Sequence, residues 1–372
     1  MTEAAPRTET VGVSPGRVNL IGEHTDYNEG YVLPIALGER ARVTISPRTT
    51  GGGDGITVSS VQLDETVEVE DPTPGEHAWW GYVAGVVWAL RERGHQIGPV
   101  TAVLDSEVPV GGGLSSSAAI ESATVLALDA HEGLGLSPEE MAEVAQAAEN
   151  DFLGVPTGPM DQRASLWCRT DHALLLDCRD LSTTHIPFAL PESLTLALVN
   201  TRSPHVLADG HYAQRRDACA AAARTLGVRA LRDIGPDDLP DALARLDDDE
   251  QVRRVRHVVT ENARVLEAVE ALRAEDWPTL GRVLTASHAS MRDDYEITVP
   301  TVDLAVETAL AHGALGSRMT GGGFGGTVIA LMPTDRVDEL TTALEAAYVE
   351  RGFTTPGVST SRASAGGIEL SR

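Results

Sequence analysis

The sequence predicts a mixed α/β protein built from two lobes, and three observations carry this prediction. The chain has 372 residues, which exceeds one average core, so two domains of roughly 150–200 residues are expected. Strand-like and helix-like segments alternate along the whole chain, a pattern typical of α/β architecture. The proline-bounded stretch at 187–191 interrupts the pattern near its middle. We therefore expect lobes at 1–187 and 188–372.

The first lobe is expected to begin with antiparallel strands over 11–47 around a polar loop at 23–29. Ser137-Pro138-Glu139-Glu140 is a capping box with proline at the first helical position, so a helix starts there and runs to Phe152. The other expected elements are a turn at 51–55, a helix over 79–93, a strand over 100–105, a helix over 117–131 and a strand over 173–177.

The second lobe is expected to open with a strand at 195–200 and to end with a strand in the tail. Between them the pattern predicts helices over 212–226, 250–273, 276–292, 301–312 and 337–351, and a strand over 327–331. The final strand is expected to return to the first lobe.

Composition excludes several classes of protein. All 29 basic residues are arginine, so enzymes that need a catalytic lysine, such as Schiff-base aldolases and protein kinases, are excluded. A net charge of −26 argues against nucleic-acid partners. The first ten residues lack an apolar signal core and no long apolar run follows, so we expect a cytoplasmic protein without membrane partners. Cys168, Cys178 and Cys219 lack metal-site spacing and are expected to be reduced and buried.

The stretch 109–119 has the form of a phosphate-binding loop. It reads Pro-Val-Gly-Gly-Gly-Leu-Ser-Ser-Ser-Ala-Ala and separates an expected strand from an alanine-rich helix. The backbone N–H groups of such a loop point inward, and the helix N-terminus adds partial positive charge. The usual loop ends in Gly-Lys-Ser/Thr, which this chain cannot supply. Backbone amides, serine hydroxyls and a metal ion would hold a nucleotide here.

Two further segments concentrate polar side chains. Residues 16–28 pack Arg, Glu, His, Asp, Tyr and Asn beside a buried-looking strand, which suits a polyhydroxylated ligand; an ordinary polar hairpin loop is the alternative. Glu149 lies at the edge of an apolar helix face, and Asp161 follows a Pro- and Gly-rich loop. A metal ligand and a fixed catalytic carboxylate are one interpretation, and a surface glutamate with a helix-capping aspartate is the other.

The segment 321–326 satisfies the GxGxxG pattern of dinucleotide-binding proteins. That pattern needs a strand before it and a helix after it, whereas β-branched residues 327–331 follow here. A dehydrogenase is therefore not expected. The glycines serve either a close backbone approach to another loop or nucleotide, or a tight packing turn.

Together, the lysine-free loop, the polar cluster and the two carboxylates fit Mg–ATP phosphoryl transfer to a hydroxyl.

These motifs closely resemble those of the GHMP family of small-molecule kinases, and residues 16–28 resemble its galactokinase branch. The motifs at 16–28, 109–119 and 320–326 occur in family order and spacing, and Met160-Asp161-Gln162 and Tyr212 with Arg215-Arg216 also match. The departures are Gly81, Gly112 and Gly322, where the family often has Asn, Ala and Ala. The resemblance covers essentially the whole chain. It implies an N-terminal lobe with a fold like that of ribosomal protein S5 and a C-terminal lobe with a ferredoxin-like fold. The active site would lie in the cleft between the two lobes.

The resemblance also implies a role for each site residue. The galactose pocket would be lined by Glu23, His24, Thr25, Asp26 and Tyr212. The triphosphate of ATP would be bound by Gly111, Gly112, Gly113, Leu114, Ser115, Ser116 and Ser117. Magnesium would be held by Ser117 and Glu149. Asp161 would be the base toward the anomeric hydroxyl, and Arg17 would orient it and stabilise charge on the transferring phosphoryl group.

The implied activity is transfer of the γ-phosphoryl group of ATP to the C1 hydroxyl of galactose, the first phosphorylation of galactose catabolism. Two alternatives stay open: a kinase for N-acetylgalactosamine or arabinose, and a non-catalytic sensor that binds galactose and ATP. The expected partners are these small molecules alone, and a monomer is expected.

Overall fold

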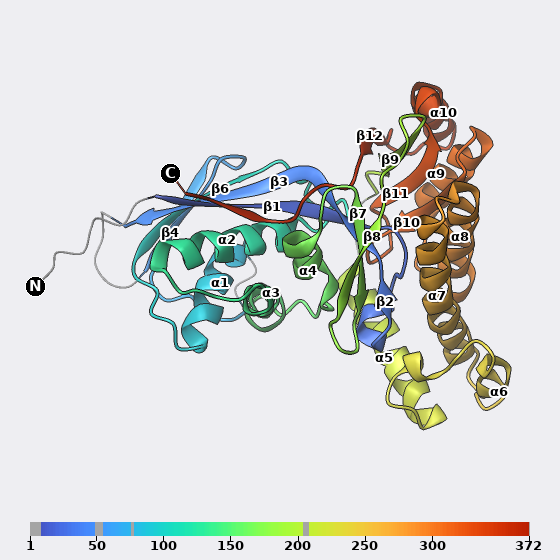
Figure 1. Cartoon of the computed structure of the whole chain (residues 1–372), viewed down its shortest axis with the longest axis horizontal. Coiled ribbons are helices and arrows are strands. Elements are labelled where there is room, and N and C mark those ends of the chain that lie inside the picture. The colour runs from blue at the N-terminus through green and yellow to red at the C-terminus, as the bar shows by residue number, and fades with distance from the viewer. Residues whose placement is uncertain (1–8, 49–54, 76–77, 204–207, 372) are drawn as a thin grey trace, which may run out of the picture.

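Three β-sheets organise the residues that the computed structural model describes, which are 9–48, 55–75, 78–203 and 208–371 (Figure 1). The six-stranded sheet has the order β13 (Ile368–Ser371), β1 (Thr10–Asn19), β3 (Pro34–Pro47), β6 (Val100–Ser106), β4 (Ile56–Ser60) and β5 (Glu65–Val69). β1 pairs antiparallel with β3, as predicted for 11–47. The turn predicted at 51–55 lies mostly outside the described residues.

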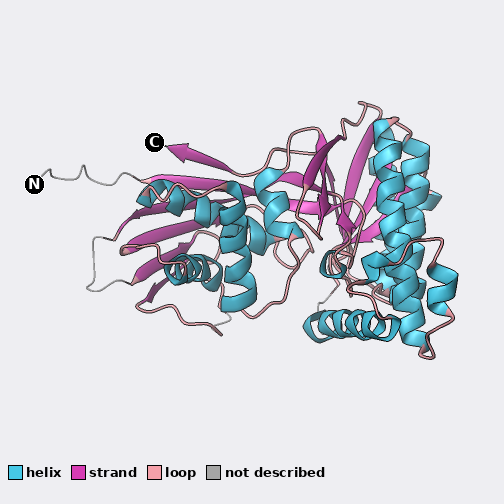
Figure 2. Cartoon of the chain, turned by 60° about the horizontal axis from the view of Figure 1, so that its bottom comes forward, coloured by secondary structure: helices cyan, strands magenta, loops and turns pink. Residues whose placement is uncertain are grey.

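Four helices pack beside the six-stranded sheet, and Figure 2 shows them on one of its faces. They are α1 (Gly81–Glu92), α2 (Ser116–Glu132), α3 (Pro138–Ala147) and α4 (Met160–Trp167). α2 lies directly on β1 and β3. At Gly12 on β1, a Cβ would overlap the carbonyl oxygen of Ala123, so glycine permits this close approach. The helix that follows the phosphate-type loop is thereby fixed to the sheet.

The helix predicted from Ser137 to Phe152 does reach Phe152, but its hydrogen-bonding pattern changes on the way. Ser137 and Glu140 form the predicted capping box, but α3 ends at Ala147. A π-turn, η2 (Ala148–Phe152), continues the chain and carries Glu149. A π-turn inserts one extra residue into a helix and is frequent at functional sites. The apolar periodicity predicted one continuous helix here because it does not distinguish the hydrogen-bonding pattern of an α-helix from that of a π-helix.

The second sheet has the order β10 (Gly316–Thr320), β11 (Thr327–Pro333), β9 (Leu194–Asn200) and β12 (Gly357–Ser361), all antiparallel. The helices of this part of the chain are α5 (Ala208–Leu226), α6 (Leu239–Leu243), α7 (Asp249–Arg273), α8 (Trp277–Ser290), α9 (Pro300–Ala311) and α10 (Val337–Glu350). α8 and α9 contact β10. The helix predicted over 276–292 ends in a second π-turn, η4 (Met291–Tyr295).

The chain crosses between the two sheets more than once. A small sheet of β2 (Tyr31–Val32), β7 (His172–Asp177) and β8 (Thr183–Pro187) is followed by β9. After β12 the chain returns, and β13 runs beside β1 with Ile368 opposite Val13 (Figure 1). The lobe boundary at 187–188 stays a prediction.

The structure buries all three cysteines, as predicted, and none of them forms a disulfide. Burial raises the pKa of Cys168 to about 12 and that of Cys219 to about 11, so neither thiol is activated. Within the described residues, no helix combines the length and apolar character that crossing a lipid bilayer requires.

Candidate active site

The glycine-rich segment 321–326 is the loop of a β-hairpin. It joins β10 to β11, so no helix follows it and the dinucleotide-binding interpretation is excluded, as predicted. A Cβ at Gly321 would come within 3.2 Å of the carbonyl oxygen of Gly113. Thr327 donates a hydrogen bond of 2.6 Å to the carbonyl oxygen of Gly112. The glycines therefore serve a close backbone approach to the phosphate-type loop.

A polar cavity of about 170 Å³ lies where the motifs meet. It is lined by Arg17, Glu23, His24, Asp26, Thr157, Gly158, Met160, Asp161, Tyr212, Gly321 and Gly322. Its volume is below the roughly 300–1,000 Å³ of sites for drug-sized ligands. The cavity therefore suits a small ligand with many hydroxyl groups, because its walls offer carboxylates, an arginine and a phenol.

Arg17 and Asp161 form a bidentate ion pair at this cavity. Arg17 Nε donates to Asp161 Oδ1 at 2.7 Å and Nη2 donates to Oδ2 at 2.6 Å. The third nitrogen, Nη1, donates to the carbonyl oxygen of Gly113 at 2.7 Å. Burial alone lowers the pKa of Arg17, but the charge and hydrogen bonds of Asp161 outweigh it and raise the pKa. Arg17 therefore stays charged and fixes both the carboxylate and the loop.

Glu23 is almost completely buried, and donors from both parts of the chain surround its carboxylate. The N–H of Gly321 donates to Oε1 at 2.7 Å, and Asn19 donates to Oε2. Arg318 Nη2 lies 3.5 Å from Oε2. Burial raises the pKa of Glu23, and Arg318 and the Gly321 N–H oppose this shift. These contacts fix Glu23 between β1 and the hairpin loop.

His24 belongs to a directed chain of hydrogen bonds. Its Nε2 lies 3.1 Å from the carbonyl oxygen of Gly322, so this nitrogen must donate. Burial, with the charge of His257 second, lowers the pKa of His24 to about 3, so the ring is neutral and Nδ1 accepts from Tyr27 Oη at 2.7 Å. Tyr295 then donates to Tyr27, and Cys219 donates to Tyr295. His24 therefore lines the cavity with both ring nitrogens already bonded within the protein.

Thr25 does not take the place expected for it. Its buried hydroxyl lies 2.7 Å from the carbonyl oxygen of Gly22 and 2.6 Å from that of Tyr31, and these two acceptors share its one hydrogen. It therefore closes the loop rather than lining the cavity. A hydroxyl with two backbone acceptors nearby satisfies itself locally, which the motif could not reveal.

Asp26 and Tyr212 also line this cavity, and their part in galactose binding stays a prediction. Burial raises the pKa of Asp26 to about 6, with the charges of Asp161 and Glu23 adding to the shift. A Cβ at Gly158 would overlap the Asp26 carboxylate. The Tyr212 ring packs against His24, with ring centroids 5.1 Å apart.

The phosphate-type loop contributes its residues in different ways. Gly111, Gly113 and Ser115 have positive φ, and Gly112 presents its carbonyl to Thr327. The Leu114 side chain is buried, and its carbonyl accepts from the Arg17 N–H at 3.0 Å. Ser115 Oγ donates to Asp161 Oδ2. Ser116 begins α2.

Ser117 and Glu149 meet as the sequence analysis expected. Ser117 Oγ donates to Glu149 Oε1 at 2.8 Å, and Thr157 Oγ1 donates to Oε2 at 3.2 Å. Burial, and then the charge of Asp161, raise the pKa of Glu149. The alternative of a surface glutamate is therefore excluded, because Glu149 is 5% exposed.

Sequence reasoning missed Thr157, Gly158 and Arg318 as site residues. Thr157 and Gly158 stand in the loop before Asp161, and the Pro-Thr-Gly-Pro pattern signals only a turn. Arg318 lies on β10, where an arginine between Ser317 and Met319 belongs to no motif. It is 0% exposed, and its Nη1 also donates to the Leu20 carbonyl at 2.7 Å.

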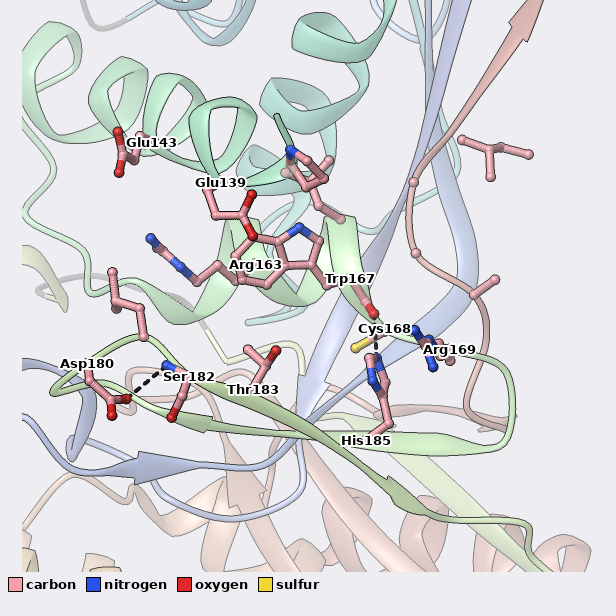
Figure 3. A pocket seen from close by; sticks show the side chains of 17 residues that line it. Glu139, Glu143, Arg163, Trp167, Cys168, Arg169, Asp180, Ser182, Thr183 and His185 are labelled. Carbon is pink, nitrogen blue, oxygen red and sulfur yellow. Dashed lines mark hydrogen bonds between the residues drawn. The ribbon is translucent and has the colours of Figure 1, made fainter. Parts of the chain in front are cut away.

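A wider cavity of about 820 Å³ lies elsewhere on α4 (Figure 3). Its charged lining residues are Glu139, Glu143, Asp180, Arg163 and Arg169. The Arg163 guanidinium lies over the Trp167 ring, with its Cζ 5.6 Å from the ring centroid. The charges in it are mixed, and no residue of the three glycine-containing motifs lines it. The smaller cavity is therefore the candidate active site.

Family profiles match three parts of the chain: "GHMP kinases N terminal domain" at residues 81–169, "GHMP kinases C terminal" at 268–350 and "Galactokinase galactose-binding signature" at 3–47. Fold and site thus define a kinase of the GHMP class. The galactokinase of Streptomyces coelicolor is 48% identical over 369 residues, covering 97% of this chain and 94% of that protein. The galactokinase of Mycobacterium tuberculosis is 45% identical, with 96% and 98% covered. The chain belongs to the galactokinase family.

Solved structures agree with this assignment. The galactokinase of Lactococcus lactis, solved with galactose, superposes with a TM-score of 0.92 at 30% identity, covering 98% of this chain and 96% of that one. The mevalonate kinase of Methanococcus jannaschii shares the fold, with a TM-score of 0.70 at 16% identity and 96% and 98% covered.

Proposed function

We propose that this protein transfers the γ-phosphoryl group of Mg–ATP to the C1 hydroxyl of D-galactose, giving α-D-galactose 1-phosphate and ADP. The observation that carries the proposal is the Asp161 carboxylate, held by Arg17 at a sugar-sized polar cavity beside the phosphate-type loop. Relatives named galactokinase, at 45–48% identity over nearly the full length, support it.

In this mechanism Asp161 accepts the proton of the C1 hydroxyl as the oxygen attacks phosphorus. Phosphoryl transfer passes through a loose transition state, so positioning and charge neutralisation carry most of the catalysis. Arg17 supplies a fixed positive charge next to both Asp161 and Gly113, where charge develops on the transferring group. Glu23, Asp26 and Tyr212 bind and orient the sugar hydroxyls.

We also propose Ser117 and Glu149 as the ligands of a magnesium ion. These two oxygen ligands are of the kind that magnesium prefers. The buried Glu149 carboxylate on η2 lies 2.8 Å from the hydroxyl of Ser117, which stands in the first turn of α2. The described residues contain no cluster of three or more His, Cys, Asp or Glu side chains arranged for a metal, and magnesium with nucleotides typically uses one or two protein carboxylates plus phosphate oxygens. When bound, the ion neutralises phosphate charge.

An ADP-release assay over a panel of sugars tests the proposed activity. We expect turnover with galactose to exceed that with N-acetylgalactosamine or arabinose, against a blank without sugar that measures ATP hydrolysis. Higher turnover with either of those sugars would reassign the substrate. Binding of galactose and ATP without ADP release would identify a sensor instead.

Replacement of Asp26 by Asn is expected to weaken galactose binding and to stabilise the free protein. The pKa of Asp26 is about 6 in the folded state, against 3.8 as its ordinary value. A carboxyl with a raised folded pKa contributes stability that is complete below its unfolded pKa and is lost as the pH rises through about 6. Asn does not ionise, so the variant avoids the cost of a buried charge. Its free energy of unfolding should exceed that of the wild type by a margin that grows by about 1 kcal/mol between pH 5 and pH 8.

Urea unfolding at the two pH values measures this gain, and galactose titration measures the affinity. Loss of a charged acceptor should raise the Kd for galactose roughly 10- to 100-fold. An equal stability difference at pH 5 and pH 8 would refute the raised pKa, and unchanged galactose affinity would remove Asp26 from the sugar site.

A further inference from the structure

Behind the proposed magnesium ligands lies a buried bridge of three side chains. Gln162 follows Asp161 on α4 and is 0% exposed. Its Nε2 lies 2.7 Å from Glu149 Oε2 and 3.0 Å from Glu121 Oε2. Glu121 is also 0% exposed and stands one turn after Ser117 on α2. One amide thus joins carboxylates from two different elements.

The amide orientation follows from the chemistry of the contacts. A glutamine nitrogen carries two N–H donors, and its oxygen only accepts. Burial raises the pKa of Glu121 and of Glu149, and a flipped amide oxygen could bond to both carboxyl groups only if both were protonated at once. The nitrogen therefore donates one N–H to each carboxylate, and Glu121 fixes the direction in which Gln162 points toward Glu149.

The two oxygens of Glu149 are consequently not equivalent. Oε2 accepts from the Gln162 amide, which cannot turn its donors away. The Thr157 hydroxyl lies 3.2 Å from Oε2 and 3.0 Å from Asn150 Oδ1, so its one hydrogen has two acceptors and the amide is the fixed donor to Oε2. Among the residues that the structure describes, Oε1 accepts only from the Ser117 hydroxyl, which can rotate. A hydroxyl can turn its hydrogen away and offer its oxygen instead, so Oε1 and Ser117 Oγ can face a cation together.

We propose that Gln162, held by Glu121, is a positioning residue that fixes Glu149 so that Oε1 is directed to the magnesium ion. This inference rests on the proposed role of Glu149 and Ser117 as metal ligands. Residues that hold a metal ligand in place typically contribute a factor of roughly 10–100 in metal affinity or activity. Gln162 contacts neither sugar nor phosphate in this assignment and acts through Glu149.

The Gln162→Met variant tests the proposal, since Met keeps the length of the side chain and removes both donors. We measure the Kd of Mn²⁺ for the protein with ADP by electron paramagnetic resonance, the Mg²⁺ concentration for half-maximal turnover, and the KM for galactose. Both metal constants should rise roughly 10- to 100-fold, while the KM for galactose stays within about twofold of the wild-type value.

Gln62→Met is the matched control, because Gln62 is exposed and its amide also donates to a carboxylate, Asp105 Oδ1, at 2.7 Å. It should leave the metal constants unchanged. A second pair keeps the test informative if Gln162→Met does not fold: Glu121→Leu removes the acceptor for Gln162 and should weaken Mn²⁺ binding, and Glu121→Gln retains an acceptor and should weaken it less.

The outcomes separate this inference from the proposed activity. Wild-type Mn²⁺ affinity in Gln162→Met, or in folded Glu121→Leu if the first variant fails to fold, would overturn the positioning role even if galactose is phosphorylated. Equal losses of Mn²⁺ affinity in Glu121→Leu and Glu121→Gln would overturn the part assigned to Glu121. Weakened Mn²⁺ binding in Gln162→Met, together with a wild-type protein that transfers no phosphoryl group to galactose, would support the positioning role and refute the activity.

Discussion

The Asp161→Asn variant is expected to lose turnover by a factor on the order of 10²–10⁴, the range for removal of a general base. Asn keeps the size of the side chain but cannot accept the proton of the sugar hydroxyl. It also has only one acceptor oxygen. In the wild type, both oxygens of Asp161 accept hydrogen bonds, from Arg17 Nε, Arg17 Nη2 and Ser115 Oγ. The effect should fall on kcat, measured by ADP release at saturating galactose and ATP.

The control for this variant is Asp151→Asn, an exposed aspartate on η2. It should keep kcat within about twofold of the wild-type value, since surface substitutions rarely exceed about 0.5 kcal/mol. Thermal unfolding of both variants separates a chemical loss from a folding defect. Near-native turnover in a folded Asp161→Asn protein would show that Asp161 orients the hydroxyl without acting as the base.

Local sequence patterns predicted the elements that follow one period. α2 was predicted over 117–131 and spans Ser116–Glu132. The antiparallel strands predicted within 11–47 are also present, although the pairing of β1 with β3 shifts register between Pro15 and Arg17. The helix that carries Glu149 ends at Phe152, as predicted, but the π-helical pattern of its last turn, Ala148–Phe152, was not predicted. The side chain of Phe152 packs near α1, and a Cβ at Gly85 would lie 3.1 Å from it. The π-helical turn therefore lies in contact with α1, a tertiary neighbour that no local pattern encodes.

The site shows the same limit. Arg17, Asp161 and Glu149 could be named from their motifs, because their chemistry is specific to charged groups. The residues that hold these side chains in place could not be named, because they belong to no motif and come from distant segments. Arg318 lies 3.5 Å from Glu23, and Gln162 donates to both Glu121 and Glu149. The orientation of His24 depends on Tyr27 and Tyr295. Which donors remain for a ligand is decided by such partners, and they become visible only when the chain is folded.

Replacement of Arg17 by Met is expected to lower kcat by a factor on the order of 10²–10³, as for loss of a group that stabilises developing charge. It should also destabilise the fold by about 3–5 kcal/mol, because Asp161 would be left as a largely buried charge without its partner. Arg17→Lys should recover only part of both losses. One ammonium cannot place three donors on Asp161 Oδ1, Asp161 Oδ2 and the Gly113 carbonyl at once.

Steady-state kinetics and urea unfolding of the two variants check these expectations. Arg273→Met is the matched control, since Arg273 is exposed and, within the described part of the chain, forms an ion pair only with the exposed Glu270. It should leave kcat unchanged. If Arg17→Met raised the KM for galactose and left kcat near the wild-type value, Arg17 would belong to sugar binding rather than to phosphoryl transfer. A full recovery of kcat in Arg17→Lys would mean that positive charge alone is required. The three hydrogen bonds from Arg17 to Asp161 and the Gly113 carbonyl would then not contribute to catalysis.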